Sequence, residues 1–159
     1  MTSGDEVVLR EYRVTDLEGI VRLDETCFAE EFRFDRRSMK AYAEARNAVS
    51  LIAEKEGEVV GFVIEHIDRV AAERRAYVVT LDVAAEYRRR GLAGRMMQAV
   101  EMLAEAAGAL RMELHVFTEN EGAIRFYERR GYERIARRKR FYGAEELDAF
   151  EYRKKLVIL

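Results

Sequence analysis

A basic segment with two glycines is the part of this sequence best suited to bind a charged group. It follows a β-branched run, residues 76–84, and leads directly into an apolar-periodic stretch of helical type. A helix that starts in this way leaves backbone N–H groups unbonded at the positive end of its dipole, where a pyrophosphate can bind. The segment consists of Arg88, Arg89, Arg90, Gly91, Leu92, Ala93 and Gly94. The sequence therefore predicts a phosphate-binding loop here, with a solvated basic turn as the alternative.

The composition of this loop favours contact between its backbone and a phosphate. Side chains larger than those of Gly91 and Ala93 would hold phosphate oxygens away from the backbone, and the arginines add positive charge at the rim. The sequence contains neither GxxxxGK[ST] nor GxGxxG. The loop therefore belongs to neither of these two nucleotide-binding classes.

Side chains suited to proton transfer near neutral pH are few. His115 lies in residues 111–117, a predicted strand, and an imidazole with a pKa of about 6.5 can accept a proton from an ammonium group near neutrality. His66 has no accompanying motif, and we interpret it as structural. Cys27 lies in an apolar helical stretch, where a small buried thiol is the simplest interpretation. Two histidines and one cysteine without ligand spacing do not support a metal site.

Alternating strands and helices must position these residues. Apolar periodicity and turn residues predict seven strands and four helices. The expected strands are residues 7–13, two runs on either side of Glu56 and Gly57, and residues 76–84, 111–117, 132–142 and 148–156. The expected helices start at Thr15, whose spacing to Glu18 matches a capping box, at about Met39 (to Arg46), after Gly91 (to Gly108) and at Asn120 (to Gly131). Residues 28–34 and a charged stretch between 67 and 76 are expected to be connections.

Length and composition limit the class of protein. A chain of 159 residues with 49% hydrophobic content predicts a single globular domain over residues 1–159. No stretch is apolar enough for a membrane span, and the first residues lack the profile of a signal peptide, so we expect a cytoplasmic protein. The 28 basic and 30 acidic residues nearly balance, which gives no support to general nucleic-acid binding.

The basic loop and a second motif together resemble the GCN5-related N-acetyltransferase (GNAT) superfamily. Arg88, Gly91 and Ala93 match its acyl-CoA loop pattern R/Q-x-x-G-x-G/A, and residues 114–132 resemble its later motif of strand, asparagine, helix and tyrosine. The predicted order of elements is similar over nearly the whole chain. The resemblance implies an α/β (α+β) fold with a mixed, mostly antiparallel seven-stranded sheet, four flanking helices, and a fourth and fifth strand that splay apart.

The resemblance also implies acetyl-CoA as the acetyl donor, without a metal. The donor's pyrophosphate is expected on the basic loop, and Asn120 is expected near the cofactor. Its pantetheine arm is expected to run beside Leu81, Asp82 and Val83. Tyr127 matches the residue that contacts the cofactor and protonates the departing thiolate, and a backbone N–H near Val83 is expected to stabilise the oxyanion.

Within the superfamily, the sequence is most similar to protein N-terminal α-amine acetyltransferases of the RimI, Ard and NatE types. Residues 138–156 resemble their aromatic hairpin, which covers a peptide N-terminus, and residues 28–34 resemble their substrate loop, although Ala29 replaces the proline of the family. The implied substrate-binding residues are Phe28, Glu30, Phe32, Phe141 and Tyr142.

The same resemblance suggests a catalytic base. RimI-type enzymes have a glutamate at the position of His115, whereas the NatE type has a histidine, and Tyr77 matches the catalytic tyrosine of the NatE type. His115 and Tyr77 are therefore the implied base, on neighbouring strands. A structural histidine and a tyrosine that ends its strand are the alternatives.

Other acceptors and partners remain open at the level of sequence. The fold is also used for small-molecule and lysine acetylation, and a non-catalytic acyl-CoA sensor would keep the same cleft. The expected acceptor is a peptide or protein N-terminus, including ribosomal or nascent proteins, on a monomer or homodimer. A ribosome or nucleic-acid contact through the arginines of residues 125–140 is a weaker alternative, because no aromatic platform accompanies them.

Overall fold

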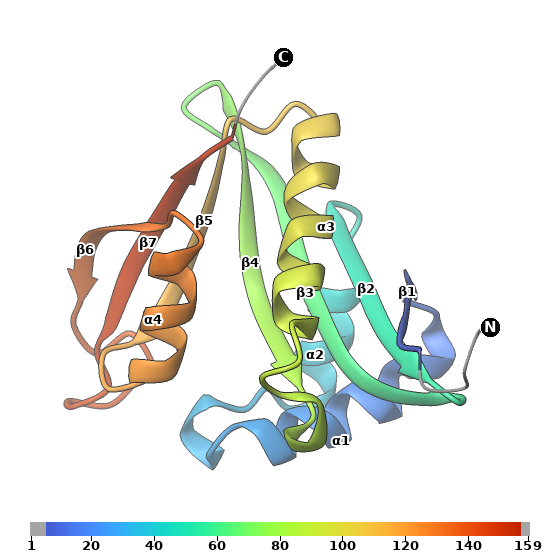
Figure 1. The fold of residues 1–159 in the computed structure, drawn as a ribbon. Coiled ribbons are helices and arrows are strands. Elements are labelled where there is room, and N and C mark those ends of the chain that lie inside the picture. Colours follow the sequence, from blue (N-terminus) through green and yellow to red (C-terminus); the bar gives the residue numbers. More distant parts are fainter. Residues whose placement is uncertain (1–5, 157–159) are drawn as a thin grey trace.

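The computed structural model describes residues 6–156, which form one seven-stranded sheet with helices on both faces (Figure 1). The strand order is β1-β2-β3-β4-β5-β7-β6, and all neighbours are antiparallel except β4 and β5. The strands are β1 (Val8–Glu11), β2 (Ala48–Lys55), β3 (Glu58–Val70), β4 (Glu73–Val83), β5 (Arg111–Phe117), β6 (Glu133–Arg138) and β7 (Ala149–Lys155). The predicted fold class is confirmed. The predicted domain, residues 1–159, extends beyond the described residues at both ends.

Four α-helices cover the sheet, two on each face. In Figure 1, α3 and α4 lie in front of the strands, and α1 and α2 lie on the other side. The helices are α1 (Leu17–Cys27), α2 (Arg36–Ala43), α3 (Leu92–Ala106) and α4 (Glu121–Arg129). No helix in the described part of the chain has the length and apolar character needed to cross a membrane.

The strands alternate between two hydrophobic cores. Leu51 and Ala53 of β2 pack in the core that contains the apolar side of α3, and Ile52 between them packs in the core formed with α1 and α2. Successive side chains of a strand point to opposite faces, so a central strand of this sheet must be apolar on both sides. This explains the continuous apolar runs on which the strand predictions were based.

The parallel strands β4 and β5 are joined only at one end. Their paired residues are Arg75 with Arg111, Ala76 with Met112, and Tyr77 with Glu113. Beyond these positions the two strands diverge, as Figure 1 shows, which confirms the predicted splay. On the other edge of β4, Val78 faces Glu65 whereas Thr80 faces Ile64, so Val79 is an extra residue in a β-bulge. Bulges of this kind redirect backbone and side chains next to active sites.

Two helix starts differ from the predictions. The capping box of Thr15 and Glu18 was wrong: α1 begins at Leu17, and the carboxylate of Asp16 accepts the backbone N–H of Arg13 at 2.7 Å. The second helix begins three residues earlier than predicted, because the carboxylate of Asp35 accepts the N–H of Ser38 at 2.7 Å and so caps the first turn. Asp35 thus caps α2, whereas no side chain caps the first turn of α1.

The charged stretch between residues 67 and 76 is part of a hairpin rather than a loop. β3 continues to Val70 and β4 starts at Glu73, so that only Ala71 and Ala72, with φ angles of 52° and 70°, form the turn. The charged side chains lie on an exposed end of the sheet, where polar residues are compatible with strands; Arg75 bonds Asp68 at 3.0 Å across the hairpin. The strands were not predicted here because these residues are exposed, and exposed strands do not show the apolar pattern from which strands are predicted.

Candidate active site

Two cavities meet in the space where β4 and β5 separate. The larger has a volume of about 860 Å³ and the smaller about 430 Å³. The residues that line both are Cys27, Phe28, Leu81, Asn120 and Ala123. These shared walls make the two cavities one continuous cleft, with the larger part toward the start of α3.

The larger cavity has the properties required to bind a phosphate. Gly91 is the N-cap residue of α3, with a φ angle of 80°, and the first bond of the helix runs from the N–H of Arg95 to the carbonyl of Gly91 at 3.0 Å. The N–H groups of residues 91–94 therefore have no partner within the helix. No side chain caps this helix, and the loop before it contributes arginines to the cavity wall. Backbone donors, helix dipole and arginines together fit a pyrophosphate.

Most of the predicted cofactor residues line this cavity. They are Leu81, Asp82, Val83, Arg88, Arg89, Gly91, Leu92, Ala93, Gly94 and Asn120. Arg90 is not in the lining; its guanidinium lies 5.5 Å from the ring of Tyr87. Tyr127 lines the smaller cavity instead.

Part of the opposite wall of the larger cavity was not predicted from the sequence. Arg125 and Arg129, four residues apart on α4, and Phe126 between them also line the larger cavity. The sequence does contain this pair of arginines at i and i+4 on the helix that follows the capping Asn120. Such a pair can face either solvent or a cavity, and only the packing of the helix against the sheet decides which. These arginines give the cavity positive charge on the side facing α3.

The smaller cavity is mostly apolar and aromatic. Of the predicted substrate residues, Phe28, Phe32 and Tyr142 line it. The ring of Phe32 lies 4.8 Å from that of Phe117 and 4.8 Å from that of Tyr142, so the 28–34 connection and the β6–β7 hairpin meet over the cleft. Glu30, in contrast, is exposed and lines neither cavity. The structure thus brings the two predicted substrate segments together.

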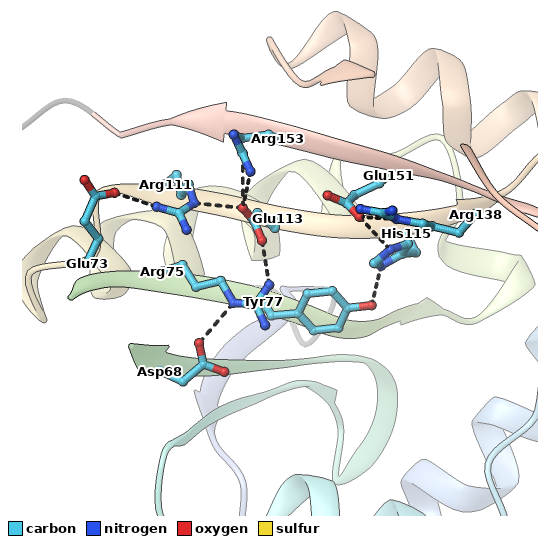
Figure 2. Close-up of polar contacts among 10 residues, drawn as sticks. All are labelled: Asp68, Glu73, Arg75, Tyr77, Arg111, Glu113, His115, Arg138, Glu151 and Arg153. Atoms are coloured by element: carbon cyan, nitrogen blue, oxygen red, sulfur yellow. Dashed lines mark hydrogen bonds and ion pairs between the residues drawn. The ribbon is translucent and has the colours of Figure 1, made fainter. Parts of the chain in front are cut away.

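A tyrosine and a histidine interact where the paired part of β4 and β5 ends (Figure 2). The hydroxyl of Tyr77 lies 2.7 Å from Nδ1 of His115. Phe141 stacks on a face of the imidazole, with 4.1 Å between ring centroids and 15° between the planes. Phe141 thus covers a face of the imidazole but does not line the smaller cavity. His115 does line it.

The titration of this pair follows from its burial. Burial lowers the pKa of His115 below its ordinary value, and the carboxylate of Glu151 only partly opposes this effect, so the imidazole is neutral near pH 7. Burial also raises the pKa of Tyr77, which keeps its hydroxyl protonated. A neutral imidazole hydrogen-bonded to a protonated phenol can accept a proton passed through the phenol oxygen.

Tyr127 has a free hydroxyl in the smaller cavity. It is held by α4, which Asn120 caps by accepting the N–H of Ala123 at 3.1 Å, and its ring packs edge-on against Tyr132 at 5.5 Å. Within residues 6–156, no group hydrogen-bonds its hydroxyl. Burial raises the pKa of Tyr127, so the hydroxyl carries a proton over the whole ordinary pH range.

A pair of buried carboxyl groups lies beside the larger cavity. Asp82 accepts a hydrogen bond from the hydroxyl of Thr80 at 2.5 Å, and Asp24 of α1 accepts the N–H of Phe34 at 3.0 Å. Burial and the neighbouring Asp24 raise the pKa of Asp82 well above its ordinary value, so the pair holds a proton. Asp24 thus holds the 28–34 connection through Phe34, beside an Asp82 whose raised pKa favours the uncharged form.

The remaining candidates of the sequence analysis have simpler environments. His66 contacts the carbonyl of Tyr42 at 2.8 Å through Nε2 and so connects β3 to α2. Cys27 is half-buried at the junction of the two cavities, 3.4 Å from the carbonyl of Val83, and burial raises the pKa of its thiol. Among residues 6–156, no group of three or more potential ligands is placed to hold a metal ion.

Comparisons with known proteins agree with this geometry. A family model described as "Acetyltransferase (GNAT) family" matches residues 17–132. An N-alpha-acetyltransferase of Sulfurisphaera tokodaii is 27% identical over 158 residues, covering 92% of each chain. N-alpha-acetyltransferase 50 of Danio rerio is 36% identical over 99 residues, covering 61% of this chain and 59% of the relative.

A solved structure shows the same fold with the donor bound. The structure of Arabidopsis thaliana NAA60 in complex with acetyl-CoA superposes with a TM-score of 0.83 at 21% identity, covering 95% of this chain and 99% of that one. The family match spans most of the chain, including the loop before α3 and the capped α4. The chain therefore belongs to the acetyltransferase (GNAT) family and is an acetyl-CoA-dependent N-acetyltransferase.

Proposed function

We propose that this enzyme acetylates the α-amine of a peptide or protein N-terminus. The observation that carries the proposal is the smaller cavity, over which Phe32 and Tyr142 meet and in whose wall His115 lies. A mostly apolar cavity that is covered by aromatic side chains and has a base in its wall suits the first residue of a chain better than an internal lysine, whose neighbours on both sides would have to fit. The relatives named N-alpha-acetyltransferases support the same acceptor.

In the proposed reaction, the chain's residues manage two proton transfers. Acetyl-CoA supplies the thioester, and the acceptor nitrogen attacks its carbonyl directly, so no enzyme nucleophile is needed. Tyr77 and His115 take the proton of the attacking amine, directly or through water. Tyr127 donates its proton to the thiolate as the carbon–sulfur bond breaks. Cys27 has no role in this sequence of steps.

The divergence of the strands explains how the carbonyl can be polarised. Beyond Tyr77, the edge of β4 that faces β5 has no strand partner among the described residues. Backbone N–H groups on this edge, next to the bulge at Val79, are placed to hydrogen-bond the oxyanion, as a backbone N–H does in other acyl transfers.

A peptide panel tests the proposed acceptor. Short peptides with free or blocked α-amines, each with an internal lysine, are incubated with enzyme and acetyl-CoA, and mass spectrometry locates the acetyl group. The proposal expects acetylation of free α-amines only. Acetyl groups on lysine, or on none of the peptides while free CoA is still released in the presence of a small amine, would overturn it.

A further inference from the structure

His115 contacts a second polar side chain besides Tyr77, the carboxylate of Glu151. Its Nε2 lies 3.3 Å from Oε1 of Glu151, on the opposite side of the ring from Tyr77 (Figure 2). Glu151 is the β7 residue directly opposite His115 in the antiparallel pairing with β5. Its side chain is 11% exposed and that of His115 is 14% exposed, so neither charge is fully screened by water.

These contacts determine where the proton of the neutral imidazole lies. A carboxylate can only accept a hydrogen bond and would repel a lone pair on Nε2, so the 3.3 Å approach favours the tautomer with its proton on Nε2. Nδ1 is then left with its lone pair, and the hydroxyl of Tyr77 donates to it at 2.7 Å. The imidazole is thus oriented so that its basic nitrogen faces the phenol in the cleft.

An arginine competes for the same carboxylate oxygen. Nε of Arg138, on β6, donates to Oε1 of Glu151 at 2.9 Å, and this oxygen is also the one nearest His115. Arg138 is half-exposed, whereas Glu151 is buried between the two strands. The carboxylate is therefore shared between a permanent cation and a group that becomes a cation only during the reaction.

We propose that Glu151 is the positioning residue of the base, holding His115 with its proton on Nε2, and that Arg138 limits the negative charge available to it. The proposal rests on the proposed role of Tyr77 and His115. As the amine proton passes through Tyr77 to Nδ1, His115 becomes an imidazolium between the phenol and the carboxylate, which it shares with Arg138. In many enzymes a base that activates a nucleophile is oriented by a third group. Here the nucleophile is the substrate amine, the base is His115 with Tyr77, and the orienting group is Glu151.

The other charged groups near His115 act in known directions. Glu113, on the same strand, favours the imidazolium but is neutralised by hydrogen bonds from Arg75, Arg111 and Arg153 (Figure 2). Tyr77 of β4 and Phe141 of the β6–β7 hairpin contact the ring without charge. Glu151 and Arg138 are therefore the pair whose opposite effects an experiment can separate.

Nuclear magnetic resonance of the ¹⁵N-labelled enzyme tests the tautomer without any acceptor. The chain has only two histidines, so the ring nitrogens of His115 are assigned by comparison with His115→Ala. We expect a proton on Nε2 and a lone pair on Nδ1 in the native enzyme and in Glu151→Gln, whose amide oxygen still accepts. A proton on Nδ1 in the native enzyme would overturn the proposal.

The titration and the rate then distinguish positioning from a merely structural role. Glu151→Gln removes the charge that favours the imidazolium. The pH midpoint of the His115 titration and the acid limb of the pH profile of kcat/KM should therefore both move to lower pH. Arg138→Gln releases the carboxylate, so both should move to higher pH. Shifts in the same direction for the two variants, or no shift in either, would contradict the proposal.

Two further variants complete the test. Glu151→Ala should lower kcat at least about tenfold, with the affinity for acetyl-CoA unchanged, because the imidazole loses its orientation. Glu145→Gln is the matched control, since Glu145 pairs with Arg140 at 3.3 Å in the same hairpin and is exposed, and it should behave as the native enzyme. If the peptide panel yields no α-amine product, the proposed acceptor fails, and the resonance experiment still decides the role of Glu151.

Discussion

Tyr77 forms the last residue pair between β4 and β5, and its hydroxyl extends past its own partner Glu113 to the imidazole of His115. This places the two side chains at the point where the sheet opens. We expect Tyr77→Phe and His115→Ala each to lower kcat by about 100-fold or more, the range of general base catalysis. Because the two act as one relay, the double variant should lose little more than either single one.

Binding of the donor should be independent of this pair. Titration calorimetry with acetyl-CoA is expected to give the same dissociation constant for the native enzyme and for both variants, since neither side chain lines the larger cavity. If the losses in kcat of the two single variants added up in the double variant, or if the affinity for acetyl-CoA fell, the two residues would not form a relay that faces the acceptor.

Tyr127→Phe separates the acid from the base. The native hydroxyl remains protonated because burial raises its pKa, so the variant should lose about 100-fold or more in kcat by the same amount at every pH between 6 and 9. Stopped assays over this range measure the ratio of variant to native rates. A ratio that changes with pH would assign the titrating group to Tyr127 and argue against its role as a permanent acid.

Gly91→Ala tests the phosphate loop, with Gly57→Ala as its control. Both glycines have φ angles near +80°, with nothing within 4 Å of an added Cβ, so the intrinsic backbone cost is similar and is about 1–2 kcal/mol. Only Gly91 borders the larger cavity. We expect both variants to lose similar stability in urea, and Gly91→Ala alone to raise the KM for acetyl-CoA. Equal KM values for acetyl-CoA in Gly91→Ala and Gly57→Ala would show that the loop is not part of the donor site.

Glu65 makes the stability of the fold depend on pH. Both of its carboxyl oxygens are buried without a hydrogen-bond partner, and burial, with a smaller contribution from Glu101, raises its pKa to about 8. The unfolded chain releases this proton near pH 4.5. The free energy of unfolding should therefore fall as the pH rises from about 4.5 to about 8, by up to about 1.4 kcal/mol per pH unit for this group.

The variant Glu65→Gln removes this dependence. Its advantage over the native protein in urea unfolding should grow between pH 5 and pH 8 and then level off. Glu58→Gln, at the exposed start of the same strand, should follow the native curve. A difference between Glu65→Gln and the native protein that stays constant over this range would mean that Glu65 is ionised in the folded state.

Local sequence signals predicted the elements around the donor better than those around the acceptor. The loop at Gly91 and the cap at Asn120 are short patterns whose residue types are dictated by backbone geometry, and the structure has both where they were predicted. The charged β3–β4 hairpin was missed because exposed strands lack the apolar period used to find them.

The acceptor side depends on contacts between residues far apart in the chain. Glu151 and Arg138 have the pattern of ordinary charges on an alternating strand, and nothing local indicates that Glu151 contacts both His115 and Arg138. The neutral state of Asp82 depends likewise on Asp24, which comes from another element 58 residues earlier. Such environments are set by packing and could not be obtained from periodicity or spacing.

The short ladder between β4 and β5 has a mechanical consequence. With three residue pairs between them, the strands β1 to β4 and the strands β5 to β7 are two smaller sheets that share one seam. Glu113 accepts hydrogen bonds from Arg75, Arg111 and Arg153, which hold its pKa at about 2. These charged contacts join the two halves at the closed end of the seam. At the open end, a bound chain with its own amides can take the place of the absent neighbour, so that occupying the cleft completes the sheet.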